Sequence, residues 1–336
     1  MNRKINFIAV LLIGLTMLLA ACSGGGSTES SGSSSEGGDD KKASGYPERN
    51  IEVLVGHGAG GGTDLFARQV TKQLEDILGV NINVVNQEGG AGVVAAQNAF
   101  NAPSDGYTLV ADAAFPITTA AGTNTHGLDD FTPIARFQAD TYALWVKKDK
   151  YASIDDFMKA VKDSPGKITV GGTGSLGMDE MTVFMLGEAA DVEMNFVPME
   201  GSGEMHAGVL GGHLEAMVDE FGPTKSLADD GSIIPLVVFA EERLDDYPDV
   251  PTTVELGWNL TDGNERGFYI KSDADPEIIK ILEEAMQKVY DSEEYQKYAE
   301  DNFLHLRDGW LNSADFTKRT GELIDKYKVI MEKLQN

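Results

Sequence analysis

A short apolar run that ends in a glycine-rich loop and leads into a helix-like segment occurs twice in this chain. The first is IEVLVGHGAGGGTDLFARQV at residues 51–70, and the second is KITVGGTGSLGMDEM at residues 167–181. Each predicts a strand, a loop and the start of a helix. Further apolar runs, such as GYTLVAD at 106–112 and IIPLVVFA at 233–240, continue the alternation. The sequence therefore predicts an α/β fold built on parallel strands.

Both loops place glycines directly before a predicted helix. The first turn of a helix has unpaired N–H groups and about half a positive charge, and glycines let a ligand come close to them. Two such helix starts facing a shared cleft can hold a carboxylate without any lysine. The alternative for either loop is that its glycines only form a tight turn. The sequence leaves both interpretations open.

Nucleotide binding is a second interpretation of the first loop. Gly56, Gly58 and Gly61 match the G-x-G-x-x-G pattern of dinucleotide-binding loops, but the acidic residue expected about 20 positions later has no clean counterpart. A Walker A loop fails because Gly62 stands where a lysine should precede Thr63. The net charge of −27 argues against nucleic acid, whose phosphates require Lys and Arg. We therefore expect no cofactor.

The second loop offers a hydrolase interpretation. Its segment TGSLG is close to the G-x-S-x-G nucleophile elbow, with Thr173 in place of the first glycine and Ser175 as the nucleophile. An exported serine hydrolase is thus the alternative function. No two histidines have zinc-site spacing and the chain has a single cysteine, so we expect no metal. Three histidines follow Ser175 without a recognisable context: His206, His213 and His305.

The N-terminus resembles an export signal. Arg3 and Lys4 precede an apolar run that ends at Ala21, which predicts a signal peptide over residues 1–21. The segment LAAC at its end resembles the bacterial lipoprotein processing box, in which the cysteine is acylated and becomes the new N-terminus. We therefore predict lipidation of Cys22. The alternative is an ordinary signal peptide with an incidental cysteine.

A linker follows the predicted lipid anchor. Residues 22–45 comprise the cysteine and a run of Ser, Gly and charged residues with almost no apolar side chains. Such a composition cannot bury enough apolar surface to fold and predicts a flexible tether. We expect the folded part to begin near Tyr46.

The order of five segments resembles the solute-binding receptors of tripartite tricarboxylate transporters, the Bug-type family. The resemblance covers nearly all of residues 46–336. It implies a type II periplasmic-binding-protein fold, in which two lobes with mixed sheets flanked by helices surround a ligand cleft. It also implies lobe 1 at residues 46–143 plus 243–336 and lobe 2 at residues 144–242. The segments are YPERNIEVLVGHGAGGGTDLFARQV, NVVNQEGGAGVVAAQNAFNAPSDGYTLVAD, PGKITVGGTGSLGMDEM, FVPMEGSGEMHAGVLGGHLEAMVDE and YPDVPTTVELG.

The resemblance assigns ligand-binding residues. In the first loop, the amides of residues 61–63 and the Thr63 hydroxyl are expected to bind the ligand carboxylate, and Asp64 is expected to cap the helix and orient the loop. Residues 112–115 match another cleft-lining loop. The full set of expected ligand-binding residues is Gly60, Gly61, Gly62, Thr63, Asp64, Ala114, Phe115, Thr173, Gly174, Ser175, Gly177, Glu220 and Arg266.

Two of these positions depart from the family pattern. Glu220 stands in a segment that usually reads Asp-Asn, so an acid replaces an amide. It could favour a ligand that carries an amine or hydroxyls as well as a carboxylate, or act through a bridging cation. Arg266 lies where the family often has an aromatic residue. It either contacts a distal ligand carboxylate or is a surface arginine on a loop.

From this resemblance we expect a lipid-anchored extracytoplasmic receptor, monomeric and without enzymatic activity. It would bind a small organic carboxylate and deliver it to the large and small membrane subunits of a transporter. Its contact with the membrane would be through the lipid anchor only. A role in sensing through a membrane kinase is a further alternative.

Overall fold

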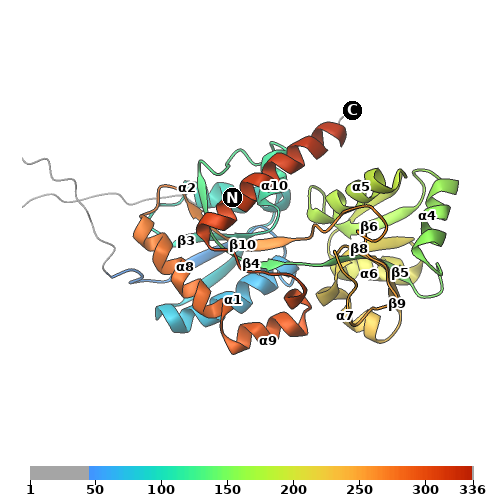
Figure 1. The fold of residues 1–336 in the computed structure, drawn as a ribbon. Coiled ribbons are helices and arrows are strands. Elements are labelled where there is room, and N and C mark those ends of the chain that lie inside the picture. The colour runs from blue at the N-terminus through green and yellow to red at the C-terminus, as the bar shows by residue number, and fades with distance from the viewer. Residues whose placement is uncertain (1–44, 335–336) are drawn as a thin grey trace, which may run out of the picture. The chain divides into compact units, whose positions relative to one another are not determined.

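Two mixed β-sheets organise the chain (Figure 1). The computed structural model describes residues 45–334, so the predicted signal peptide and Cys22 lie outside the described residues. In sheet A the strand order is β2-β1-β3-β10-β4. Strand β1 pairs in parallel with β2 and β3, and β10 is antiparallel to β3 and β4. The strands of sheet A are β1 (Ile51–Val55), β2 (Ile82–Asn86), β3 (Thr108–Asp112), β4 (Phe131–Ala139) and β10 (Glu265–Lys271).

Sheet B repeats this plan. Its strand order is β7-β6-β8-β5-β9, with β6 parallel to β7 and β8 and with β5 antiparallel to β8 and β9. In each sheet four strands thus run in one direction and one, β10 or β5, runs in the opposite direction. The strands of sheet B are β5 (Tyr142–Lys147), β6 (Thr169–Thr173), β7 (Asn195–Met199), β8 (Ala216–Glu220) and β9 (Ile233–Val238).

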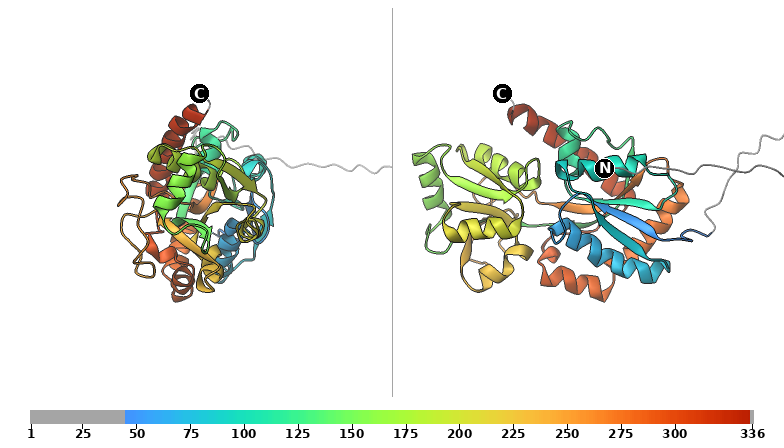
Figure 2. Two further views of the ribbon diagram at one scale, coloured as in Figure 1. Left: turned by 90° about the vertical axis from the view of Figure 1, so that its right-hand side faces the viewer. Right: turned by 180° about the vertical axis from the view of Figure 1, so that it is seen from behind.

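Helices cover both faces of sheet A. Alternate residues of a strand point to opposite faces, and accordingly Val53 packs in the cluster of α1, α8 and α9, whereas Leu54 packs in the cluster of α2, α3 and α10. The right view of Figure 2 shows helices on both sides of this sheet. The helices are α1 (Gly62–Leu78), α2 (Val93–Asn101), α3 (Phe115–Ala120), α8 (Pro276–Tyr290), α9 (Glu293–Asp301) and α10 (Ser313–Leu334), with short 3-10 turns η1 (Gly90–Gly92) and η2 (Leu304–Leu306).

Sheet B is covered in the same way. Leu144 of β5 packs in the cluster of α4 and α5, and Trp145 packs in the cluster of α6 and α7. The four helices are α4 (Ile154–Asp163), α5 (Met178–Ala190), α6 (Ser202–Gly211) and α7 (Phe221–Asp229).

Helix α10 packs against both sheets. Phe316, near its start, lies in a core cluster of sheet A, whereas Leu323 and Tyr327 lie in a core cluster of sheet B. The Tyr327 hydroxyl donates to the Met178 sulfur at the start of α5, at 3.2 Å. At 22 residues α10 is the longest helix described. Neither it nor another helix of residues 45–334 is both long and apolar enough to cross a membrane.

The chain crosses between the sheets at two adjacent places, after β4 and before β10. The amide of Asp140 donates to the carbonyl of Asn264 at 2.8 Å, so the two crossing segments are bonded to each other. A Cβ atom on Gly263 would overlap the carbonyl oxygen of Asp140. The close contact of the two crossings therefore requires glycine at position 263.

We predict that Gly263→Ala lowers the free energy of unfolding by about 1–3 kcal/mol, because a backbone atom cannot move aside as a side chain can. Thermal and urea unfolding would measure the loss. Gly203→Ala is the matched control: Gly203 lies inside α6 and a Cβ there meets nothing within 4 Å. That variant should be neutral or about 0.4–1 kcal/mol more stable. Equal stability of the two variants would contradict the prediction.

Candidate ligand-binding site

The first glycine loop joins β1 to α1 and is open to solvent. Gly60, Gly61 and Gly62 are exposed, and the extended residue Gly61 caps the helix. The interpretation of Thr63 and Asp64 as the cap is wrong, since both lie within the first turn and are buried. The N–H groups of this first turn have no acceptor within the helix. The amide of Gly61, which was expected to bind the ligand, instead donates to the carbonyl of Gly58 at 3.1 Å.

Asp64 holds the loop from inside. Its Oδ2 accepts a hydrogen bond from the Gly60 amide at 2.8 Å, and its Oδ1 accepts one from Asn86 at 2.9 Å. Arg68 donates to both carboxylate oxygens. Burial opposes ionisation, but the hydrogen bonds from Arg68, Gly60 and Asn86 lower the pKa of Asp64 below its usual value. The expected loop-orienting role of Asp64 agrees with these contacts.

The second glycine loop, between β6 and α5, is built in a similar way. Gly174 and Ser175 are exposed, and Gly177 caps α5. Asp179, in the first turn of α5, accepts hydrogen bonds from the Thr173 amide at 2.6 Å and from the Thr173 hydroxyl at 2.9 Å. Both donors of Thr173 are thus directed to Asp179, as the amide of Gly60 is directed to Asp64.

Six buried or partly buried polar residues lie where the chain crosses between the sheets, and we call them the crossover cluster. Arg266 on β10 donates to Asp140 through Nη1 and to Oε1 of Glu220, at the end of β8, through Nη2 at 2.8 Å. Oε1 of Glu220 also accepts from Asn264 at 2.6 Å. The crossover cluster consists of Asp140, Tyr142, Asp179, Glu220, Asn264 and Arg266.

The crossover cluster extends from one glycine loop to the other. At one end, a Cβ atom on Gly62 would lie 2.6 Å from Nη2 of Arg266, so the guanidinium packs directly against the first loop. At the other end, the Tyr142 hydroxyl donates to Asp179 at 2.6 Å, and Asp179 holds the second loop. Arg266 is only 6 % exposed, so the alternative of a surface arginine is wrong.

Acidic groups outnumber basic ones in this region. Burial, with a smaller effect of the neighbouring Asp219, raises the pKa of Asp179 to about 7. Burial and Glu220 raise the pKa of Asp140, against the opposing effect of Arg266. Asp219 itself is paired with His206 at 2.7 Å. A carboxyl group of this region therefore keeps its proton at a pH where an exposed one is ionised.

Ala114 and Phe115, which were also expected to bind the ligand, lie between β3 and α3 and at the start of α3. The Ala114 amide donates to Asp112 at 3.1 Å, and the ring of Phe115 is 1 % exposed and stacked on Tyr269. Phe115 can therefore reach a ligand only through its backbone. His206, proposed among the partners of Ser175, is bonded to Asp219. In residues 45–334 no hydrogen bond joins Ser175 to a histidine.

Three members of the crossover cluster were not expected from the sequence: Asp140, Tyr142 and Asn264. They lie on the crossing segments or next to them, outside any recognisable motif. Asp179 was not among the expected ligand-binding residues either. A usable signal existed for it, because an acid stands in the first turn of the helix after each glycine loop.

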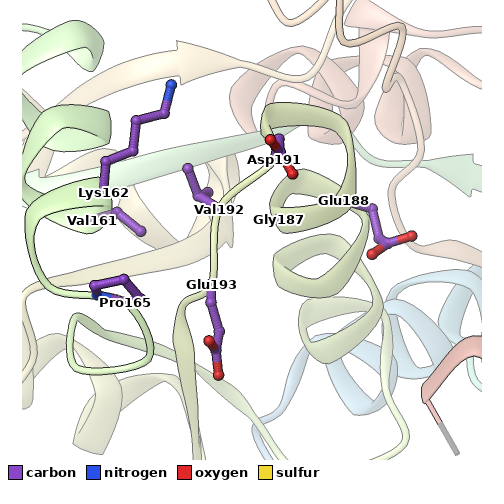
Figure 3. Close-up of a pocket in the computed structure, with 8 residues that line it drawn as sticks. All are labelled: Val161, Lys162, Pro165, Gly187, Glu188, Asp191, Val192 and Glu193. Atoms are coloured by element: carbon purple, nitrogen blue, oxygen red, sulfur yellow. The ribbon is translucent and has the colours of Figure 1, made fainter. Parts of the chain in front are cut away.

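A separate depression lies between the end of α4 and the end of α5 (Figure 3). It contains none of the predicted ligand-binding residues. Its lining includes Lys162 and three acidic side chains, Glu188, Asp191 and Glu193, which point in different directions in Figure 3. In the described part of the chain, no group of three or more His, Cys, Asp or Glu side chains could hold a metal ion.

Comparison with known proteins identifies the family. The profile of the tripartite tricarboxylate transporter family receptor matches residues 66–335. The chain belongs to this family. A relative from Cupriavidus necator, the UPF0065 protein in the gbd 5' region, is 28 % identical over 299 residues. That alignment covers 87 % of this chain and 90 % of the relative.

Solved structures agree with the family assignment. A TctC solute-binding protein from Polaromonas is 25 % identical with a TM-score of 0.69, covering 86 % of this chain and 99 % of that one. MatC from Rhodopseudomonas palustris, solved with bound malate, is 23 % identical with a TM-score of 0.75, covering 85 % and 99 %. The predicted type II periplasmic-binding-protein fold, with two mixed sheets flanked by helices, is confirmed. The chain is a solute-binding receptor of its family.

The raised pKa of Asp179 predicts how stability changes with pH. The folded protein holds this proton up to about pH 7, whereas the usual pKa of an exposed aspartate is 3.8. The contribution of Asp179 to the free energy of unfolding is therefore most favourable at acidic pH. It becomes less favourable as the pH rises from about 4 to about 7, because the unfolded chain releases this proton first. Asp179→Asn removes this titration. Relative to the native protein, the variant should gain about 1–4 kcal/mol in unfolding free energy between pH 4 and pH 8.

Urea unfolding at several pH values measures this gain. Asp163→Asn is the control, because the Asp163 side chain is 63 % exposed. Its stability should run parallel to that of the native protein across the pH range. Parallel curves for Asp179→Asn as well would show that Asp179 is already ionised in the folded protein at low pH.

Proposed function

We propose that this receptor binds a small organic carboxylate between the two glycine loops, outside the cytoplasm, and delivers it to the large and small membrane subunits of a tripartite tricarboxylate transporter. The observation that carries the proposal is the crossover cluster, which contacts the first loop at Gly62 and holds the second through Asp179. The family membership and the bound malate in the related MatC support the same ligand class.

The first loop would supply most of the anion binding. The amides at the start of α1 and the Thr63 hydroxyl would bind the carboxylate, assisted by the positive end of the helix dipole. Gly60 to Gly62 expose their backbone to solvent, so no side chain blocks the approach. Asp64 would stay behind the loop, bonded to Gly60.

The second loop would contact the ligand from the opposite side. Ser175 and Gly177 are the proposed donors, because the donors of Thr173 already bind Asp179 and the amide of Gly174 donates to the carbonyl of Met199 at 2.9 Å. Gly174 would contribute only an exposed surface without a side chain. Thr173 would then act by shaping the loop. Ala114 and Phe115 would contribute backbone groups, since the Phe115 side chain is buried.

We assign the two lobes of the proposed receptor to residues 46–143 plus 243–336 and to residues 144–242. Sheet A lies in the first and nearly all of sheet B in the second. Motion of the lobes about the crossing segments would close the loops around the ligand and exclude water, which strengthens each polar contact. A single chain provides both loops, so a monomer is sufficient for binding.

The test is a thermal-shift and calorimetric screen of mono-, di- and tricarboxylates. A ligand at 100 times its Kd should stabilise the protein by about 2.7 kcal/mol. Thr63→Val, which removes one hydroxyl without changing the shape, should weaken binding by more than about tenfold through loss of one hydrogen bond to a charged group. Thr71→Val, one turn or more further along α1 and bonded to the Arg68 carbonyl, is the matched control.

Two outcomes would count against this proposal. If no carboxylate changes the unfolding midpoint, carboxylate binding is wrong, and ester cleavage that Ser175→Ala abolishes would favour the hydrolase alternative. If carboxylates bind but Thr63→Val has native affinity, the first loop does not hold the carboxylate.

Attachment to the membrane is proposed through lipidation of Cys22. Cys22→Ser should release the protein into the soluble fraction, because two acyl chains gain about 0.8 kcal/mol for each methylene buried in the bilayer. Fractionation of cells that express each form measures the change, with Ser23→Ala as the control. Retention of Cys22→Ser in the membrane fraction would contradict the anchor.

A further inference from the structure

The guanidinium of Arg266 is already occupied by acidic side chains of the protein itself. Asp140 and Glu220 both form ion pairs with it, and the side chains of all three are at most 10 % exposed. A second carboxylate of a ligand would have to compete with Glu220, or would bring a third negative charge to one cation. This arrangement disfavours ligands that present a carboxylate to Arg266 at the Glu220 side.

In residues 45–334 the hydrogen bonds that the Glu220 carboxylate accepts end on one oxygen. Arg266 and Asn264 donate to Oε1 at 2.8 and 2.6 Å, and the Tyr142 hydroxyl oxygen, which donates to Asp179, lies 3.4 Å from the same atom. A carboxylate has about four acceptor positions on its two oxygens. Oε2 is therefore placed to accept a donor from a ligand, on a side chain that is 10 % exposed.

Arg266 offers the complementary group. Its Nε is buried and has no hydrogen-bond partner, and the residue is 6 % exposed. The edge of the guanidinium that carries Nε faces the first loop: a Cβ atom on Gly62 would lie 2.6 Å from Nη2 and 3.6 Å from Nε. The unpaired donor Nε of Arg266 and the acceptor Oε2 of Glu220 thus belong to the same ion pair, and Nε lies beside the first loop.

A buried donor without a partner is costly, so a ligand oxygen that pairs with Nε would be favoured. The carboxylate that the first loop is proposed to bind supplies such an acceptor oxygen, and it would lie next to Gly62. The other half of the ligand then meets Glu220, the acidic partner in the same ion pair. An ammonium group suits that position better than a hydroxyl, and much better than a second carboxylate.

We propose that Glu220 is a specificity-determining residue and that the ligand is an amino acid, with its carboxylate toward the first loop and Arg266 Nε and its ammonium on Glu220 Oε2. This inference rests on the proposed carboxylate-binding function. It narrows the ligand class to carboxylates that carry an ammonium group.

Matched ligand pairs test the inference on the full-length protein. Succinate and aspartate, glutarate and glutamate, and butyrate and 2-aminobutyrate each differ by one ammonium group. Isothermal titration calorimetry should give the amino member at least about tenfold tighter binding in the pair that fits the site, as expected for one charge-assisted hydrogen bond. This comparison uses the native protein and does not depend on whether a variant folds.

Glu220→Gln should then reduce the preference for the amino member about tenfold or more. The neutral amide loses the charge-assisted bond but can still accept from Arg266 and Asn264, and Asp140 still pairs with Arg266. The plain acid should bind as well as before or better, because the repulsion from Glu220 is gone. Glu193→Gln, in the depression between α4 and α5, is the matched control and should keep the native ratio.

The outcomes separate this inference from the function on which it rests. If plain acids bind at least as tightly as their amino partners, the inference is wrong and carboxylate binding stands. An amino preference that Glu220→Gln leaves unchanged overturns the role of Glu220. If no member of any pair binds, both the inference and the proposed function fail for these ligands.

Discussion

A buried positive charge governs the middle of this molecule. A guanidinium removed from water must be paired, because an isolated buried charge is far more costly than a paired one. Arg266 finds its partners on two different parts of the chain, Asp140 on a crossing segment and Glu220 at the end of β8. One side chain of sheet A is thus paired with a residue of sheet B, and only the loss of both pairs would leave the guanidinium uncompensated.

The two glycine loops share a method of construction. In each, a carboxylate from the first turn of the following helix reaches back to a backbone amide of the loop: Asp64 to Gly60 and Asp179 to Thr173. Each loop therefore has a shape set by its own helix before any ligand arrives. Preformed donors lose less entropy on binding than flexible ones, which favours affinity for a small ligand.

The sequence predicted the strand–loop–helix segments well because their signals are local. Strands β4, β5 and β10 were not recognised, since nearly every residue in them is buried and no alternation marks them. Strand β4 even carries Arg136 and Gln138 in its buried run, and Arg136 is balanced by Glu265 at 2.6 Å. The crossover cluster was out of reach for a similar reason, because Arg266 and Asp140 are 126 residues apart in the chain.

Helix α10 has a mechanical consequence. In helix α10, Phe316 packs in the core of sheet A and Tyr327 packs in the core of sheet B. A helix that packs against both sheets permits only those relative motions of the sheets that keep both contacts intact. Bending at the crossing segments therefore requires the C-terminal part of α10 to slide along the core of sheet B or to separate from it. The contact between Tyr327 and the core of sheet B therefore limits the angle between the two sheets as much as the crossing segments do.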